Sequence, residues 1–588
     1  MNAILGRCML AALLAGAPMA ARAADEEILK RIDALSREID QLKAQVRAGE
    51  EKAVRAGEEA RAQARRAEDR SIGRWLTVGG DYRFRYDYLS AETRAFTDVS
   101  ATFANAQQRL QADFFANPTG LSSYFGAPQA GGLTTAAALS GLMGFSQAMG
   151  AVRTHDEALA FMSHPMNAGL IQGLGAFAVP VAAYKPRNES LYTNRLRLDL
   201  HAKATQDVGV TARFVMYKVF GSQDDEAFAN GAAAPYFADR VGVFDGTLGH
   251  VPSGSHLSVD RAYGTWSNIG GKDIWFSVGR RPSTQGAPAN LRLNEPRPGT
   301  GGTPSLLVDY AFDGMTLGYA PDLDGLPGAF AKLCYGRGYE SGYRRTPANT
   351  ISDTDMLGIS VVAIDTDKLR VWGQWNRGFH IFDAPAMRDT YFGTTAPKVD
   401  LGDIDWFGVG AMGTLKGVGP GDLHLFADAA LSVTHPSRNV SAQFGFQGLL
   451  TGGFFAPEAP SSKRGRAIAV GLRYDLPSRT RLGLEYNRGS ENWITFAPAA
   501  DDAWTSKVGT RGNVYEAYVI RELDLKPVSS ALSKAFFRLG FQYYDFSHTG
   551  SNNWVGAPVP ISALQGQMSA LTPLAKAFNA YGTFEVKF

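Results

Sequence analysis

Arginine and aspartate recur at every second position in several stretches of the chain. Near position 80 they are Asp81, Arg83, Arg85 and Asp87, and positions 82, 84, 86 and 88 hold only Tyr or Phe. Alternate side chains of a β-strand point to opposite faces, so the charges share one face and the rings share the other. So many charges need water or partners, because an unpaired buried charge is strongly unfavourable. The chemistry that they predict is the selection of ions in a water-filled lumen, where Arg and Lys favour anions.

The same alternation places further charges on the lumen side of other predicted strands. The predicted lumen cations are Arg83, Arg85, Arg195, Arg197, Lys203, Arg213, Arg473, Arg481 and Arg538, and the predicted anions are Asp81, Asp87, Asp199, Asp428, Asp475 and Glu485. Arginines clustered on the first three strands would form a positive wall with a mild anion preference. The alternative is that arginines and aspartates pair across strands and only brace the wall.

The elements that must position these charges are long alternating strands. Their connections differ in length in a regular way: those near 270–272, 365–367, 417–421 and 477–479 are short, whereas those at 221–258, 381–402, 434–463, 491–512 and 547–577 are long. Short turns on one side and long loops on the other are typical of a transmembrane barrel. The 65 glycines and the aromatic content of 11% fit the same class. We therefore predict an all-β membrane protein, an antiparallel transmembrane β-barrel preceded by an α-helical coiled coil.

The number of strands depends on how residues 305–320 are interpreted. A first count gives 17 strands, which would place the chain termini on opposite sides of the membrane. The apolar positions are even up to Phe312 and odd from Met315, so the alternation slips at Asp313–Gly314. A hairpin there is one interpretation, and a β-bulge within one strand is the other. With the bulge, residues 321–328 become a short turn and the prediction is 16 strands, with 18 as the alternative.

A long insertion, residues 91–189, separates the first two predicted strands within a barrel of residues 75–588. It is rich in Ala, Gly and Met and poor in charge, and we expect short helices at 104–116 and 134–152. Long loops with secondary structure of their own tend to be functional. We expect this segment to fold into the mouth and narrow it, or else to form a surface cap without effect on flow.

The N-terminal region predicts export followed by a coiled coil. Arg7, the apolar run 8–17 and Ala21-Arg22-Ala23 fit a secretory signal peptide over residues 1–23. Residues 25–70 keep apolar or small residues at alternating spacings of four and three, beginning with Ile28, Ile32 and Leu35. This pattern predicts a periplasmic coiled coil that serves self-association or contacts the cell wall.

The last residues predict how the barrel is assembled. Phe584, Val586 and Phe588 lie on one face of an alternating strand that ends the sequence. A terminal aromatic residue of this kind resembles the signal that the outer-membrane barrel assembly machinery recognises.

Sequence motifs of other function classes were not found. The chain has no dinucleotide or P-loop glycine pattern after a strand, no H-E-x-x-H and no C-x-x-C-H. We therefore expect no catalytic residue, no cofactor and no metal. The net charge of +2 is too small to argue for nucleic acid. After the N-terminus no apolar stretch is long enough for a helical membrane span.

Together with the coiled-coil stretch, residues 275–282 (WFSVGRRP) and 303–305 (TPS) resemble those of a Gram-negative putative-porin family. Much of that family is catalogued as a domain of unknown function. The resemblance implies channel activity and a location in the outer membrane. We expect a passive diffusion channel for small hydrophilic solutes that is surrounded by outer-membrane lipid and, since many porins are trimers, forms a homotrimer. Ile and Leu along the seam favour two strands instead. The alternatives are a structural anchor tethered through its coiled coil and a barrel sheath or conduit around a partner protein.

Overall fold

The computed structural model divides the chain into two units, residues 1–75 and 76–588. It describes residues 75–588 except 121–133, 220–256, 300–301, 344–350, 386, 391–392, 498–501, 527–532, 565 and 571. The predicted signal peptide lies outside the described residues. So does the predicted coiled coil, apart from Ala34 and Glu38, which are both helical.

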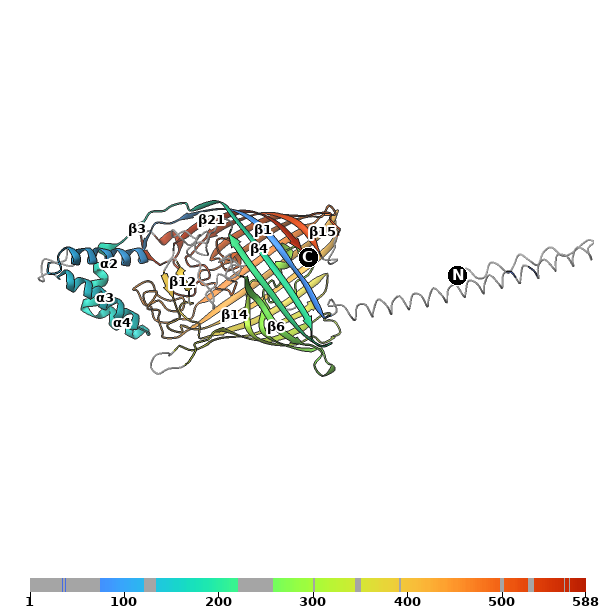
Figure 1. Ribbon diagram of the computed structural model, residues 1–588, viewed down its shortest axis with the longest axis horizontal. Coiled ribbons are helices and arrows are strands. Elements are labelled where there is room, and N and C mark those ends of the chain that lie inside the picture. The colour runs from blue at the N-terminus through green and yellow to red at the C-terminus, as the bar shows by residue number, and fades with distance from the viewer. Residues whose placement is uncertain are drawn as a thin grey trace, which may run out of the picture. The chain divides into compact units, whose positions relative to one another are not determined.

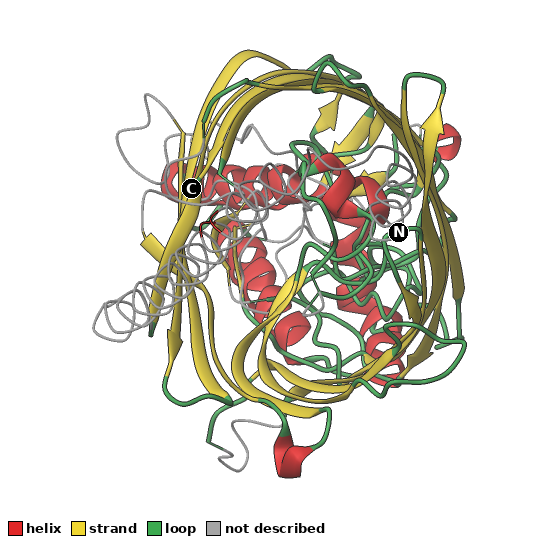
Figure 2. Ribbon diagram, turned by 90° about the vertical axis from the view of Figure 1, so that its right-hand side faces the viewer, coloured by secondary structure: helices red, strands yellow, loops and turns green. Residues whose placement is uncertain are grey.

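Sixteen strands of the described chain close into one antiparallel barrel (Figures 1 and 2). They are β1 (Leu76–Thr93), β4 (Arg187–Lys203), β5 (Val208–Val219), β6 (Leu257–Trp266), β7 (Ile274–Ser283), β8 (Tyr310–Tyr319), β9 (Phe330–Tyr339), β10 (Thr354–Asp365), β11 (Leu369–Phe379), β14 (Gly402–Val418), β15 (Gly421–Pro436), β16 (Arg464–Asp475), β17 (Thr480–Gly489), β18 (Gly512–Glu522), β19 (Lys534–Phe546) and β21 (Leu574–Lys587). Each pairs with its neighbour in sequence, and β21 closes the barrel against β1. The predicted fold class and strand number are confirmed.

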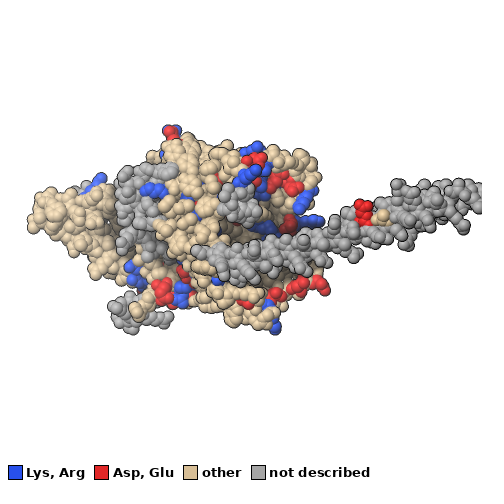
Figure 3. Space-filling view, turned by 45° about the vertical axis from the view of Figure 1, so that its right-hand side comes forward, with Lys and Arg blue, Asp and Glu red and all other residues tan. Residues whose placement is uncertain are grey.

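Apolar side chains cover the outside of the barrel, although they are exposed in the isolated chain. Val78, Val409, Leu484 and Leu539 each keep more than half of their surface accessible. On the face seen in Figure 3, charged side chains gather toward the two ends of the barrel and leave a band of other residues between them. A closed sheet leaves no unpaired edge, and an apolar outer band fits hydrocarbon, so this is a membrane-spanning barrel. In the part of the chain that the structure describes, no helix is long and apolar enough to span a membrane.

The predicted β-bulge at Asp313–Gly314 is wrong, although the strand number that it led to is correct. β8 pairs with β7 from Ser283–Tyr310 to Ile274–Tyr319 without a shift of register. Phe312 is buried on the inner face, whereas Met315 is exposed on the outer face. The apolar residues change sides because Phe312 meets an apolar core inside the barrel, with its ring 6.1 Å from that of Phe496. The backbone itself does not slip.

That apolar core lies inside the barrel, and it brings together connections that are far apart in the sequence. It includes Trp406 of β14, Trp493 and Phe496 from residues 490–511, and Leu307 from residues 284–309. The ring centroids of Trp406 and Phe496 lie 4.3 Å apart. Burying each large side chain stabilises the fold by about 1.5–3 kcal/mol. The long connections therefore fold inward and fill part of the lumen with ordered protein.

The insertion between β1 and β4 forms helices at the end of the barrel that carries the long connections (Figure 1). They are α2 (Val99–Ala116), α3 (Thr135–Ala151), α4 (His155–Ser163) and α5 (Pro165–Leu174), followed by the 3₁₀ helix η2 (Gly175–Phe177). Asp98 and Thr154 cap α2 and α4 through their side chains. Phe145 and Phe161 pack against Phe446 in the connection 437–463. The predicted helices are confirmed, and they pack on a loop at the rim of the barrel. In the view of Figure 2 they lie across the opening that the strands enclose.

The remaining elements are short. β2 (Phe96–Asp98), β3 (Pro180–Val181) and β20 (Met568–Ser569) form one small sheet, and β12 (Met387–Thr390) pairs with β13 (Gly393–Thr395). One helical turn, α6 (Ala289–Arg292), lies between β7 and β8. The other 3₁₀ helices are η3 (Ile269–Gly271), η4 (Lys507–Gly509) and η5 (Ile561–Ala563).

Candidate functional site

The charges of the first predicted strands lie together on the inner face of the barrel. Arg83 and Arg85 of β1, and Arg195 and Arg197 of β4, each keep 6% or less of their surface exposed. β1 and β4 pair so that Arg83 is directly opposite Arg195. Strand pairing therefore brings four guanidinium groups together on one part of the inner face. These four residues, with Arg213 of β5 and Arg261 of β6, form a surface that we call the arginine wall.

Aspartates on the same strands pair with these arginines. Asp81 accepts from both Arg195, at 2.8 Å, and Arg197. Arg85 lies 2.7 Å from Asp87, and Arg213 lies 2.5 Å from Asp199. The wall thus carries six arginines and, with Asp260 of β6, four aspartates. The aspartates therefore pair with arginines within and across the strands, and the arginines of the wall outnumber its aspartates by two.

The connection 284–309 folds inward and reaches the opposite wall. Three cations of that wall donate to consecutive carbonyl groups at the C-terminal end of α6: Arg473 to Leu291 at 2.8 Å, Arg538 to Arg292 at 2.6 Å, and Lys587 to Leu293 at 2.8 Å. Cations suit this end of a helical turn, which carries the negative end of the helix dipole. Arg473 and Arg538, predicted to line the lumen, therefore hold the loop that crosses it.

The connection 490–511 folds inward beside the first loop. Its Lys507 forms ion pairs with Glu485 of β17 and Glu516 of β18. Its Asp502 accepts from Arg292 at 2.8 Å. The backbones of the two loops also join, since Asp309 donates to the carbonyl of Phe496 at 2.9 Å and Phe496 donates to that of Leu307 at 2.9 Å. Hydrogen bonds and ion pairs therefore join the two loops into one structure across the lumen.

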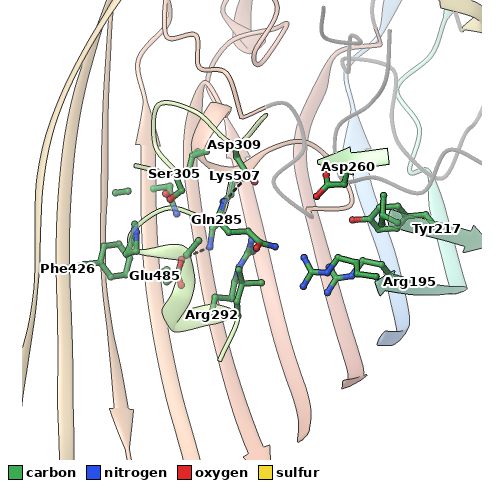
Figure 4. Close-up of a pocket in the computed structure, with 18 residues that line it drawn as sticks. Arg195, Tyr217, Asp260, Gln285, Arg292, Ser305, Asp309, Phe426, Glu485 and Lys507 are labelled. Carbon is green, nitrogen blue, oxygen red and sulfur yellow. Dashed lines mark hydrogen bonds and ion pairs between the residues drawn. The ribbon is translucent and has the colours of Figure 1, made fainter. Parts of the chain in front are cut away.

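A cavity of about 60 Å³ lies between this structure and the arginine wall (Figure 4). Its charged lining residues are Arg195, Arg197, Arg292, Lys507, Asp260, Asp309 and Glu485. In Figure 4, Arg195 extends from the wall toward Arg292 on the loop. Four cations and three carboxylates thus face one enclosed space within the barrel. We take this cavity as the candidate site for solute passage.

The structure places the predicted lumen residues on the inner face, with different surroundings. Asp81, Arg83, Arg85, Asp87, Arg195, Arg197, Asp428, Arg473 and Arg538 are buried, Asp199, Arg213, Asp475, Arg481 and Glu485 are half-buried, and Lys203 is exposed at the end of β4. Of the charged residues around the cavity, the sequence prediction contained Arg195, Arg197 and Glu485. It missed Arg292, Lys507 and Asp309, because loops lack the alternation that identifies a strand face. It also missed Asp260 of β6, which lies where the pairing of β5 with β6 shifts register.

The predicted assembly signal lies on the outer face at the closure of the barrel. Phe584 and Val586 alternate with the buried residues of β21, and Phe588 is exposed. Phe588 exchanges two backbone hydrogen bonds with Gly80 of β1, at 2.9 and 3.0 Å. The last residue therefore takes part in joining the last strand to the first.

Among the residues that the structure describes, no group of three or more His, Cys, Asp or Glu side chains could hold a metal ion.

A family model described as "Protein of unknown function (DUF3373)" matches residues 185–588. The chain belongs to this family. The match begins near β4 and runs to the last residue, so it covers fifteen of the sixteen barrel strands and both inward loops. No curated protein matches the chain.

Several solved structures resemble this DUF3373 barrel at low sequence identity. OmpT of Vibrio cholerae in its trimer form is 11% identical, with a TM-score of 0.34 and coverage of 87% of this chain and 100% of that one. The outer membrane channel DcaP of Acinetobacter baumannii is 11% identical, with a TM-score of 0.35 and coverage of 87% and 97%. An anion-selective porin from Comamonas acidovorans is 9% identical, with a TM-score of 0.36 and coverage of 87% and 99%.

Proposed function

We propose that the chain is an outer-membrane porin, a passive diffusion channel for small hydrophilic solutes that mildly prefers anions. The observation that carries this proposal is the cavity between the arginine wall and the inward loops. A charged space within a membrane-spanning barrel is costly to keep dry, because taking charged groups out of water is unfavourable even where they form ion pairs. Water in that space gives ions and polar solutes a path.

The anion preference follows from the charges that face the cavity. Four cations, Arg195, Arg197, Arg292 and Lys507, compare with the three carboxylates of Asp260, Asp309 and Glu485. Low-dielectric walls strengthen the effect of such an excess on a passing ion. The excess is one charge, so the preference is mild.

Because inward loops fill part of the lumen, the structure fits a selective channel better than a wide, open one. The apolar core around Trp406 and Phe496 occupies the side of the lumen next to β8–β16. The remaining passage lies beside β4–β6, where the arginines are. Solutes thus pass close to fixed charge.

The same apolar core supports a second candidate function, a structural anchor whose barrel is closed by its own loops. In that case the coiled coil would tether the membrane to the cell wall. The anchor and the channel differ in one property, the flow of ions through the folded barrel.

We propose that outer-membrane lipid surrounds the barrel and that the coiled coil lies in the periplasm. The outward row of Phe584, Val586 and Phe588 supports recognition by the barrel assembly machinery. A homotrimer stays a prediction that rests on many porins being trimers.

The reversal potential in a salt gradient tests the selectivity. We expect an anion preference in the unchanged protein and a shift toward cations in the double variant Arg195→Gln, Arg197→Gln, because both positive charges then leave the passage. Arg521→Gln is the matched control, since Arg521 contacts Ser478 and Thr480 near a short turn. A clear cation preference of the unchanged protein would contradict the proposal.

A further inference from the structure

A second cavity, of about 40 Å³, lies on the other side of the base of the loop 284–309, where the two ends of the loop come together. Two hydrogen bonds join the ends of the loop at its base. Thr303 donates to the carbonyl of Ser283 at 3.2 Å, and Ser305 donates to the carbonyl of Ala287 at 3.0 Å. The passage described above touches Ser305 and Asp309, whereas the second cavity touches Ser283 and Thr303. The inner faces of β8–β11 form its other side.

Three deeply buried side chains in its lining carry polar atoms without a hydrogen-bond partner among the described residues. They are Nε of Arg281, Oε1 of Gln374 and Nδ2 of Asn376. The three residues keep 8%, 7% and 7% of their surface exposed. Gln374 and Asn376 are already joined to each other at 3.0 Å through their remaining amide atoms. Buried polar groups are nearly always satisfied, so three such atoms around one cavity indicate a polar guest.

The charge of the lining indicates which guest fits. Arg281 is its charged residue, and no Asp or Glu is among the residues that line it. The ammonium group of Lys332 lies on the same face of β9, two positions before the lining residue Cys334. Arginine binds carboxylates through charge-assisted hydrogen bonds. The free amide atoms of Gln374 and Asn376 offer one acceptor and one donor, which a hydroxyl group satisfies together.

We propose that this cavity binds a small hydroxycarboxylate, with its carboxylate on Arg281 and its hydroxyl group between Gln374 and Asn376. The site is separate from the passage and does not depend on it. A solute held there lies against the base of the loop 284–309, which narrows the channel.

Cys334 makes the proposal testable, because its thiol lines the cavity and is partly exposed. The sequence has one other cysteine, Cys8, so a Cys8→Ser background leaves a single thiol. The full-length barrel in detergent is treated with two methanethiosulfonate reagents, one bearing a sulfonate and one a trimethylammonium group. We expect the anionic reagent to label Cys334 about tenfold faster or more, as expected of a reagent attracted by fixed charge. Lactate slows the labelling, whereas its neutral analogue lactamide does not.

Two variants separate binding from simple access to the thiol. Arg281→Gln removes both the charge preference and the protection by lactate. The double variant Gln374→Leu, Asn376→Leu keeps the charge preference and loses the protection. Arg521→Gln is the matched control that keeps both, and heat-dependent migration in gels verifies that each barrel is folded. Equal labelling by the two reagents, no labelling at all, or equal protection by lactamide would overturn the proposal. The readout needs no ionic current, so its failure is distinct from failure of channel activity.

Discussion

Arg292, the last residue of α6, lies 2.8 Å from Asp502 and 3.3 Å from Glu516. The three residues come from two inward loops and from strand β18, and both carboxylates are fully buried. One guanidinium group therefore joins both loops to the barrel wall at the cavity through which we propose that solutes pass.

Arg292→Ala tests this junction. Removing one partner of a buried ion pair leaves uncompensated charge, which costs about 3–5 kcal/mol. We expect a lower unfolding temperature and a larger, noisier single-channel current, because the loops lose their link. Arg297→Ala is the control: Arg297 is half-exposed and pairs with Asp365, and exposed pairs contribute about 0–1 kcal/mol. Equal effects of the two variants would contradict the assigned role.

Trp493→Ala tests whether the apolar core keeps the lumen narrow. Trp493 is fully buried, and its indole nitrogen donates to the carbonyl of Val508 at 2.7 Å. Truncating a buried Trp costs about 3–5 kcal/mol. We expect lower stability together with higher conductance, both measured on refolded protein. Lower stability with unchanged conductance would mean that the core does not border the path of ions.

We expect the contact between α4 and the rim loop to depend on pH. Arg438 donates to Asp156 at 2.6 Å, and this hydrogen bond and charge hold the pKa of the Asp156 carboxyl below its ordinary value of 3.8. A lowered pKa means that the contact stabilises the folded helix above the ordinary value and is lost as pH falls below it. We expect hydrogen exchange at the start of α4 to speed up, relative to intrinsic exchange, below about pH 4. In Asp156→Asn this acid-dependent increase is absent, and an identical pH profile in the variant would refute the assignment.

Phe588→Ala tests the proposed assembly signal. The backbone bonds to Gly80 do not need the ring, so the variant keeps the closure of β21 on β1 while losing the terminal aromatic group. We expect a several-fold lower yield of folded barrel in cells, read from heat-dependent migration, and normal refolding of purified protein in detergent. Leu482→Ala, at another outward-facing position, is the control. A normal yield for Phe588→Ala would remove the proposed signal.

Much of the barrel could be predicted from the sequence because its alternation has a single physical cause. On β1 and β4 the outer face meets lipid and the inner face meets water and charge, so period two identifies both faces. The same rule fails on β8, where Phe312 meets an apolar core made by loops. Which way a residue points can therefore be predicted only where the two sides of the wall differ in polarity.

The site could be predicted only in part for a related reason. Arg195 and Arg197 follow from the strand pattern, but Arg292 and Lys507 lie on loops whose inward paths are set by contacts distant in sequence. Arg473 binds the carbonyl of Leu291 across 182 positions. Nothing local to residues 284–309 indicates that the loop crosses the lumen, and the charge-poor insertion 91–189 was the more conspicuous candidate.

The central claim is that a water-filled passage runs through the folded barrel, and single-channel recording in a planar bilayer tests it most directly. We predict stable openings on the order of a nanosiemens or less, below those of an unobstructed sixteen-strand barrel. Folding is verified on the same sample by heat-dependent migration. A fully folded barrel that carries no current at any applied voltage would contradict the channel and leave the closed structural anchor.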